Sequence, residues 1–330
     1  MPPTGLPRWM ECRCRKLGYF GHGGRLDGDG RAIIANHSQL AMKHQPTPHF
    51  APHRSRGFSL VELLVVIAVI AVLLALVLNA ATSARAGASK ASEMAAARSL
   101  ITAWTHYATD NRGSVMPGYA SGFRGRDSKG EWLNVSTADV AVMRWPLRLA
   151  PYLGHDFASL FSGVTRDSLD SIASAPTSSG LYSVSVAPAF GMNSVFVGGD
   201  ENYGGSTEIF TETFGNFYAT KLSTVKNPDK LGVFLTSQNL SSVTGKVKQG
   251  FFRVIPPAWT TPLWATEYDP ENPVTAGFVS PRHQEGAKDV AIVANVDGGV
   301  STSTIDDLRD MRRWCDLATS SDWLMTPVGP

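Results

Sequence analysis

A long apolar segment constrains the fold of this chain more than any other feature. Between Phe58 and Leu78 the only charged side chain is Glu62. A helix of this length spans about 30 Å, the thickness of the hydrocarbon core of a bilayer. A carboxylate inside such a segment costs roughly 2.5–3.5 kcal/mol on insertion scales, so Glu62 is expected to have a partner. The segment predicts a membrane-spanning helix, and its simplest interpretation is a single anchor or an uncleaved signal.

The residues at the start of this segment favour a more specific interpretation. The apolar segment begins directly after Arg54, Arg56 and Gly57, and it lacks the small-residue cleavage site that follows the apolar core of a secretory signal. The sequence from Gly57 to Ile70, GFSLVELLVVIAVI, resembles the processing site of type IV prepilins and type II secretion pseudopilins. The resemblance implies that a prepilin peptidase cuts between Gly57 and Phe58 on the cytoplasmic face and methylates the new amino terminus.

The same resemblance implies a role for Glu62. After cleavage Glu62 is the fifth residue of the mature chain, and its carboxylate is expected to pair with the Phe58 ammonium of a neighbouring subunit during assembly. A buried charge is tolerated when it is paired and becomes costly when the partner is lost. The implied partners are the prepilin peptidase, other pilin or pseudopilin subunits and the inner-membrane assembly platform.

Residues 1–57 are expected to be a leader that is removed. Prepilin leaders are usually short and basic, whereas this one is long and of no clear periodicity. We expect Met42 to be the true start and residues 1–41 not to be translated, because the segment from Met42 to Gly57 contains basic residues and no acid. This charge bias predicts that the leader stays in the cytoplasm. The resemblance then implies a single-pass protein in the inner (cytoplasmic) membrane, with an extracytoplasmic carboxy-terminal domain.

The helical pattern continues well beyond the apolar segment. No proline and a single glycine, Gly87, occur before about Asp110, so residues 58–112 are expected to form one long helix that is transmembrane over 58–78. Two stripes at helical spacing follow the apolar segment. Small residues, expected to face neighbouring helices, are Ala81, Ala84, Ala88, Ala91 and Ala95; the stripe expected to face the chain's own domain contains Met94, Ala97, Ile101, Trp104 and Ala108. Gly113 is a natural helix stop.

Residues 113–330 are expected to form a soluble, β-rich domain, because proline and glycine recur and the apolar segments are short. The complete prediction is an α+β, pilin-like fold in which one long amino-terminal helix packs on an antiparallel sheet. Expected strands are Leu181–Val186, Ser194–Val197, Leu231–Leu235, Lys248–Val254, Val290–Val296 and Val300–Thr304. Expected helices are Thr137 to Arg144 and, after a capping box of Thr304 and Asp307, Ile305 to Leu317.

Further sequence pieces resemble a large pilin-like subfamily common in planctomycetes and verrucomicrobia. These pieces are Trp145-Pro146 through Pro151-Tyr152-Leu153-Gly154, Phe190-Gly191-Met192-Asn193, Val225-Lys226-Asn227-Pro228, and Arg282-His283 followed by Asp297-Gly298. The subfamily usually places nine residues between His and Asp-Gly-His. Here His283 and Asp297 are further apart, and Gly299 stands in place of the second His. His283, Asp297 and Gly298 are interpreted as structural residues of a hairpin, and a metal or ligand role for His283 remains the alternative.

Other functional classes find little support in the sequence. No catalytic constellation, nucleotide-binding loop or zinc-protease motif occurs, so no enzyme activity and no cofactor are expected. The net charge of +2 does not indicate nucleic-acid binding. Cys12 and Cys14 fall in the leader, which leaves Cys315 alone in the mature chain. The acidic pairs Asp200-Glu201 and Asp269-Pro270-Glu271 are interpreted as solvated turns, with calcium binding as the alternative.

Two functions remain open at this level, with a membrane-anchored enzyme as a distant third. The first is a structural subunit of a type II secretion pseudopilus or of a type IV pilus-like filament. The second is a membrane-anchored minor pilin or adhesin that binds polysaccharide or a secreted substrate, for which Trp259 and Trp264 are candidate exposed aromatics, although a place in the core is the favoured interpretation for both.

Overall fold

A computed structural model of the chain describes residues 57–126, 130–154, 160–161, 178–205, 207–241 and 244–329. The expected leader before Gly57, with its internal start at Met42, lies outside the described residues. Residues Leu60–Pro330 form one compact unit, and the description below concerns this unit.

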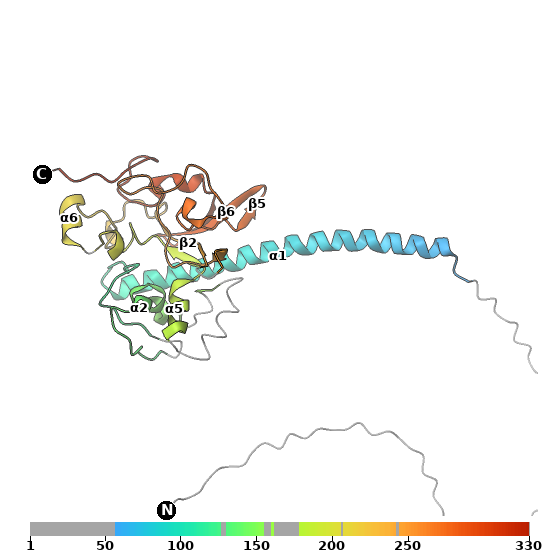
Figure 1. Cartoon of the computed structure of the whole chain (residues 1–330), viewed down its shortest axis with the longest axis horizontal. Helices are drawn as coiled ribbons and strands as arrows, with labels where there is room; N and C mark the ends of the chain where they lie inside the picture. The colour runs from blue at the N-terminus through green and yellow to red at the C-terminus, as the bar shows by residue number, and fades with distance from the viewer. Residues whose placement is uncertain are drawn as a thin grey trace, which may run out of the picture. The chain divides into compact units, whose positions relative to one another are not determined.

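One long helix, α1, spans Leu60–Asp110, as the sequence predicts (Figure 1). The helix ends where the backbone adopts positive φ at Arg112 and Gly113, with φ values of 58° and 79°. The N–H of Gly113 donates to the carbonyl of Ala108 at 2.7 Å and so satisfies one carbonyl of the last turn. Gly113 therefore acts as the expected stop.

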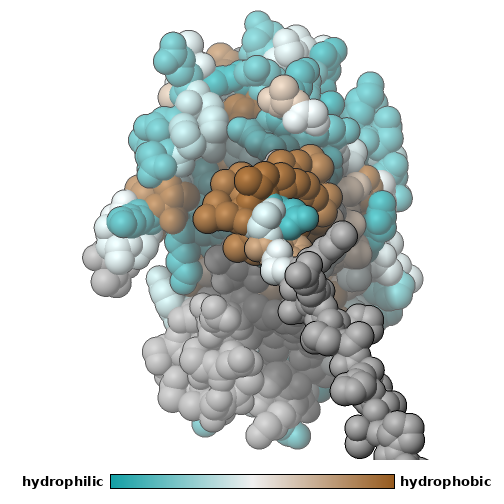
Figure 2. Space-filling view, turned by 90° about the vertical axis from the view of Figure 1, so that its right-hand side faces the viewer, coloured by the Kyte–Doolittle hydropathy of each residue, from teal (hydrophilic) through white to brown (hydrophobic). Residues whose placement is uncertain are grey.

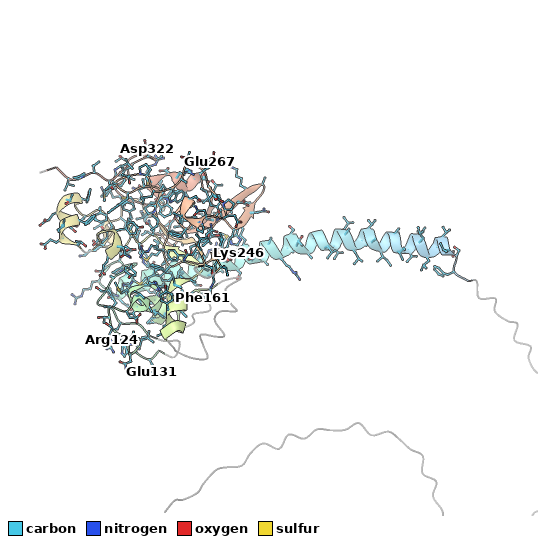
Figure 3. All side chains as sticks on the ribbon, in the orientation of Figure 1. Arg124, Glu131, Phe161, Lys246, Glu267 and Asp322 are labelled. Atoms are coloured by element: carbon cyan, nitrogen blue, oxygen red, sulfur yellow. The ribbon has the colours of Figure 1, made fainter. Side chains whose placement is uncertain are left out.

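The two halves of α1 have different surroundings. The first half projects from the domain, and its apolar side chains are exposed (Figure 3). No other described segment of the chain packs against them. Seen along the helix from its amino-terminal end, these side chains form a compact apolar patch in front of a largely hydrophilic domain (Figure 2). In the second half the stripe of Ala97, Ile101, Trp104 and Ala108 is buried against the domain. The expected division of the helix into an outer and an inner part is confirmed.

The domain is built on an antiparallel sheet with strand order β1-β2-β6-β5, in which β7 also pairs with β6. A separate hairpin, β3–β4, completes the strands. The strand bounds are β1 Phe190–Met192, β2 Gly232–Thr236, β3 Gln238–Leu240, β4 Val247–Gln249, β5 His283–Glu285, β6 Lys288–Asn295 and β7 Val300–Ser303. The inner half of α1 packs across β2, β5, β6 and β7. The antiparallel sheet beside a long helix confirms the predicted α+β class.

The central strand β6 separates two hydrophobic cores. Its residues Ile292 and Ala294 face the core shared with α1, whereas Ala291 and Val293 face a second core on the other side of the sheet. This alternation follows from the period of two along a strand. Trp104, Trp145 and Phe234 are among the largest side chains of the first core, and Trp264 and Trp314 belong to the second. Because both faces of the middle of β6 are covered, its residues from Val290 to Ala294 are all apolar.

Short helices surround these cores. The α-helices are α2 Val140–Met143, α3 Pro146–Leu149, α5 Ser178–Val186 and α6 Glu208–Phe214. The 3₁₀ turns are η1 Ala150–Leu153, η3 Glu201–Tyr203, η4 Leu222–Thr224, η5 Pro273–Ala276, η6 Asp307–Arg309 and η7 Met311–Arg313. The expected helix from Thr137 to Arg144 is reduced to α2, whose first turn is capped by the Asp139 carboxylate.

Two of the predicted strands are wrong. Leu181–Val186 belongs to helix α5, and its buried residues Leu181, Val184 and Ser185 have helical spacing. Ser194–Val197 is a turn that ends in an isolated bridge, because the N–H of Val197 bonds to the carbonyl of Asn193, four residues back. A further expected strand, Lys248–Val254, is correct only up to Gln249, the last residue of β4.

The chain leaves strand β4 at Gly250 for a steric reason. The φ of Gly250 is +95°, and a Cβ there would lie 2.5 Å from the carbonyl oxygen of Ala187. The expected strands over Leu231–Leu235, Val290–Val296 and Val300–Thr304 are confirmed as β2, β6 and β7, with bounds shifted by one or two residues.

The expected closing helix over Ile305–Leu317 is also wrong, although its start is confirmed. Thr304 and Asp307 form a reciprocal capping box, in which each backbone N–H bonds to the side chain of the other residue. The helix fails at Asp310, which has an extended backbone (φ −74°, ψ 110°) and uses its carboxylate to cap the N–H of Arg312. Asp310 therefore divides the segment into the two turns η6 and η7.

Candidate functional site

The expected processing site lies at the exposed start of α1. Gly57, Phe58 and Ser59 precede the first helical residue, and the Phe58 side chain is 75% exposed. A Cβ at Gly57 would meet no atom within 4 Å. Both residues of the expected cut therefore lie outside the helix, and the processing itself stays a prediction.

Glu62 lies in the first turn of α1 with its side chain exposed. A carboxylate at this position interacts favourably with the partial positive charge at the helix amino terminus. Its neighbours along the helix, from Leu60 to Leu78, form a continuous apolar surface that fulfils the length and composition of a membrane span. The pairing of Glu62 with a second subunit stays a prediction.

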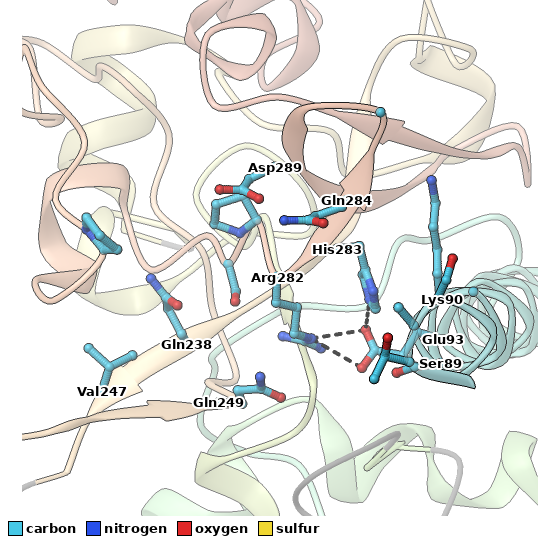
Figure 4. Close-up of a pocket in the computed structure, with 18 of the residues that line it drawn as sticks. Ser89, Lys90, Glu93, Gln238, Val247, Gln249, Arg282, His283, Gln284 and Asp289 are labelled. Carbon is cyan, nitrogen blue, oxygen red and sulfur yellow. Dashed lines mark hydrogen bonds and ion pairs between the residues drawn. The ribbon is translucent and has the colours of Figure 1, made fainter. Parts of the chain in front are cut away.

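The structure brings His283 together with two residues that sequence reasoning left without a role, Glu93 and Arg282. We call these three residues the junction cluster. The Nε2 of His283 lies 2.7 Å from Oε2 of Glu93, and the Nε of Arg282 lies 3.0 Å from the same oxygen (Figure 4). The Arg282 guanidinium also donates to the backbone carbonyls of Ser237 and Ala189, each at 3.0 Å.

The junction cluster joins α1 to the sheet. Glu93 is on α1, while Arg282 and His283 are at the start of β5, and all three side chains are less than 10% exposed. Burial acts to raise the pKa of Glu93, but the hydrogen bond with His283 and the positive charge of Arg282 outweigh it and lower that pKa below its usual value of 4.5. The cluster is therefore a buried, hydrogen-bonded joint with an ionised carboxylate, and the structural interpretation of His283 stays a prediction.

Glu93 could have been found from the sequence. It is the only acidic residue between Glu62 and Asp110, and it lies four residues before Ala97 on the stripe that faces the domain. A lone carboxylate on a buried helical stripe requires a cationic partner. The identity of the partner could not be found in this way, because Arg282 is 189 residues away.

Asp297 and Gly298 form the tight turn between β6 and β7. Gly298 has a φ of 86°, and the Asp297 carboxylate accepts the N–H of Gly299 at 2.8 Å. This turn follows the last residue of β6, whereas His283 pairs with Val290 near the beginning of β6. The two parts of the expected motif thus have separate structural roles at opposite ends of one strand.

A large groove lies beside the junction cluster, between α1, the β3–β4 hairpin and the β5–β6 hairpin (Figure 4). We call it the junction groove; its volume is about 1180 Å³. Polar side chains predominate around it. They include Ser83, Ser89, Lys90, Gln238, Gln249, Tyr268, Gln284 and Asp289.

The aromatic side chains considered for binding are mainly part of the cores. Trp264 is 8% exposed and donates to the carbonyl of Ile255 at 2.8 Å, so the interpretation of Trp264 as core is confirmed. Trp259 is half-buried and stacks on Phe210 with ring centroids 5.5 Å apart. Trp104 is fully buried in the first core, as expected.

The two acidic turns differ from one another. The interpretation of Asp200 as a solvated turn residue is wrong, because it is 1% exposed and forms an ion pair with Arg253 at 3.4 Å. Burial raises the pKa of Asp200 despite the opposing effect of Arg253. Asp269 is exposed and caps the N–H of Glu271 at 2.9 Å.

Metal and thiol chemistry have no assembled site in the part of the chain that the structure describes. There, no three His, Cys, Asp or Glu side chains are grouped so that they could hold a metal ion. Cys315 is buried, and burial raises the pKa of its thiol to about 12, which keeps the sulfur protonated and unreactive.

Comparison with known families gives one match. Residues 52–78 match the family model described as the prokaryotic N-terminal methylation motif. Together with the long apolar helix, this match supports a type IV pilin-like protein that is anchored in a membrane through α1. No curated protein and no solved structure matches the chain.

Proposed function

We propose that the chain is a non-enzymatic subunit of a type II secretion pseudopilus or a type IV pilus-like filament. One observation carries the proposal: the methylation motif opens a 51-residue helix whose apolar half is bare, while only the other half is used by the chain's own fold. A bare apolar helix needs lipid before assembly and other helices afterwards. Both are supplied by a filament that grows from a membrane.

Processing is the first step of this proposal. A prepilin peptidase cuts after Gly57 and methylates the amino group of Phe58. Two features support this step: the match over residues 52–78 and the exposed position of both residues before the helix begins. The basic residues Arg54 and Arg56 favour a cytoplasmic leader, which places the sheet domain on the other side of the inner membrane.

Assembly is the second step. Glu62 of one subunit pairs with the Phe58 ammonium of its neighbour within the apolar layer, where an ion pair is favoured over two separate charges. The partners are then the peptidase, other pilin or pseudopilin subunits and the assembly platform of the inner membrane. We also propose that the sheet domain is related to the pilin-like subfamily of planctomycetes and verrucomicrobia.

Mass spectrometry of the mature amino terminus tests the proposal. We expect N-methylated Phe58 in membrane fractions of cells with the peptidase and an intact leader in cells without it. A Gly57→Glu variant should retain its leader, and the matched change Gly87→Glu on the same helix should not affect cleavage. An unmethylated terminus, or cleavage near Ala81, would contradict the proposal.

A second candidate function is a minor subunit that binds a ligand through its sheet domain. The junction groove favours this candidate, because it is a concave surface with several polar side chains, formed by the domain and the segment of α1 that follows the apolar half.

A further inference from the structure

The junction groove is a binding site, we infer, for a neutral oligosaccharide. The inference adds a ligand site to the proposed filament subunit, and it does not depend on the apolar half of α1. Four lines of observation support it: the unused polar groups of the groove, its charge, its size and its rigid wall.

The groove contains more hydrogen-bonding groups than the chain itself uses. Among the described residues, the side chains of Gln249, Gln284 and Asp289 have no hydrogen-bond partner, and Gln238 has only a 3.4 Å contact with the Tyr268 hydroxyl. Each amide supplies two donors and an acceptor, and the carboxylate supplies acceptors. Convergent polar groups in a concave surface are typical of ligand sites. Adjacent sugar hydroxyls, which both donate and accept, match this supply.

The charges of the groove compensate one another. Lys90 forms an ion pair with Glu285 at 3.2 Å, and the side chains of Arg282 and His283 are directed to Glu93. Asp289 then remains the one charged lining group without an ion-pair partner among the described residues. Such a surface does not attract a strongly anionic ligand, since nucleic acids and sulfated glycans require clustered cations. A neutral ligand suits it better.

The size of the groove favours an oligomer. At about 1180 Å³ it exceeds the roughly 300–1,000 Å³ of pockets for single small molecules. One wall is α1 from Thr82 to Glu93, a length of about 16 Å at 1.5 Å per residue. Polar side chains outnumber the apolar lining residues, which are Ala86, Val247, Pro270 and Pro281.

The wall is rigid because the junction cluster fixes α1 to β5 at the edge of the groove. A fixed wall lowers the entropy cost of binding, since the site does not have to be ordered by its ligand. The Arg282 guanidinium and the Nε2 of His283 are used in this joint, so the amides of the groove are the main recognition groups.

The experiment uses the full chain in detergent and the probes cellohexaose, laminarihexaose, maltohexaose and mannohexaose, with hexagalacturonate as an anionic comparator. By calorimetry we expect at least one neutral hexasaccharide to bind in preference to hexagalacturonate. The double variant Gln249→Ala/Gln284→Ala should weaken this binding by at least about tenfold, because two recognition amides are lost. The matched control is Asn216→Ala, an exposed amide elsewhere in the domain, which should bind as the wild type does.

Three results would overturn the inference: none of the neutral probes binds, hexagalacturonate binds as tightly, or the double variant binds unchanged. The competing occupant of the groove is a second copy of the chain, and a photoreactive side chain at position 249 in place of Gln249 tests for it. If two copies cross-link in membranes and no glycan binds, the groove is a subunit contact. Amino-terminal processing of the double variant is measured in parallel. For the wild-type chain, normal processing without glycan binding would contradict this inference alone. Glycan binding without processing would contradict the filament proposal alone.

Discussion

The outer and inner halves of helix α1 share one backbone but are adapted to different surroundings. From Leu60 to Leu78 the helix is apolar on all sides and exposed, whereas from Glu93 to Asp110 only one stripe is buried and the rest is polar or small. A helix that is apolar all round belongs in a membrane or among other helices, and an amphipathic one belongs on a domain. The comparison predicts that the stability of the domain and the anchoring of the chain can be changed independently.

The largest effect on the domain is expected for Trp104→Ala. This side chain is fully buried in the first core, and removing a buried Trp costs about 3–5 kcal/mol. Membrane association should not change. Chemical unfolding of the full chain in detergent, followed by circular dichroism, measures the first quantity, and fractionation measures the second. Trp104→Phe is the control, since the indole N–H has no partner among the described residues. A similar loss for both variants would contradict the packing argument.

Glu93→Ala should destabilise the domain by an amount in the lower part of the same range. Breaking a buried ion pair costs about 3–5 kcal/mol when the remaining charge is left without compensation. Here Arg282 keeps its bonds to the carbonyls of Ser237 and Ala189, which reduces the loss. The control is Glu285→Ala, which removes the exposed contacts with Lys90 and Thr302 and should change the unfolding midpoint much less. Equal midpoints for the two variants would show that the junction cluster does not hold α1.

Val69→Arg should weaken membrane association and leave the domain stable, which is the opposite of the effect of Trp104→Ala. An arginine near the centre of a membrane span costs roughly 2.5–3.5 kcal/mol on insertion scales, so membrane association should fall. Val69 is exposed and contacts nothing in the domain core, so the unfolding of the domain should not change. The apolar control Val69→Leu should behave as the wild type in both measurements. If this variant destabilised the domain, the outer half of α1 would contribute to domain stability, which would contradict the comparison.

Gly113→Ala tests the boundary between α1 and the domain. The φ of Gly113 is +79°, and a left-handed conformation costs a residue with a Cβ about 1–2 kcal/mol. Gly87→Ala lies within the helix and has free space around it, so it should increase helix stability by roughly 0.5–1 kcal/mol. The same substitution therefore has opposite signs at the two positions. Unfolding midpoints and helical content by circular dichroism measure the pair.

The features that the sequence predicted correctly depend on local patterns. The length of α1 follows from a continuous stretch without proline, and its stop at Gly113, the alternation in β6 and the capping box of Thr304 and Asp307 can each be identified within a few residues. The predicted strand at Leu181–Val186 failed because its β-branched and aromatic residues outweighed the helical spacing of Leu181, Val184 and Ser185. Packing against α2 and α3 determines the helix there.

The junction cluster and the junction groove required the tertiary structure. Glu93 is visible in the sequence as a lone acid on a buried stripe, but its partners come from a segment almost 190 residues later. The groove is lined by α1, by β3 and β4 and by the β5–β6 hairpin, which are distant in sequence. No local pattern in any one of them indicates a binding surface.

The smallest effect is expected from acid, and it depends on the sign of the pKa shift of Glu93. The folded state holds this pKa below its ordinary value of 4.5, through His283 and Arg282, so the folded chain binds fewer protons than the unfolded chain in this range. The stability from Glu93 is therefore fully present above about pH 4.5 and is lost as the pH falls through the lowered value. Asp307 and Asp310, with lowered pKa values, also titrate in acid, so the wild type alone cannot isolate Glu93. In Glu93→Gln, which keeps the shape and cannot titrate, the free energy of unfolding should fall less steeply below pH 4.5. Parallel curves for the two proteins would mean that the junction cluster is not ionised in the folded state.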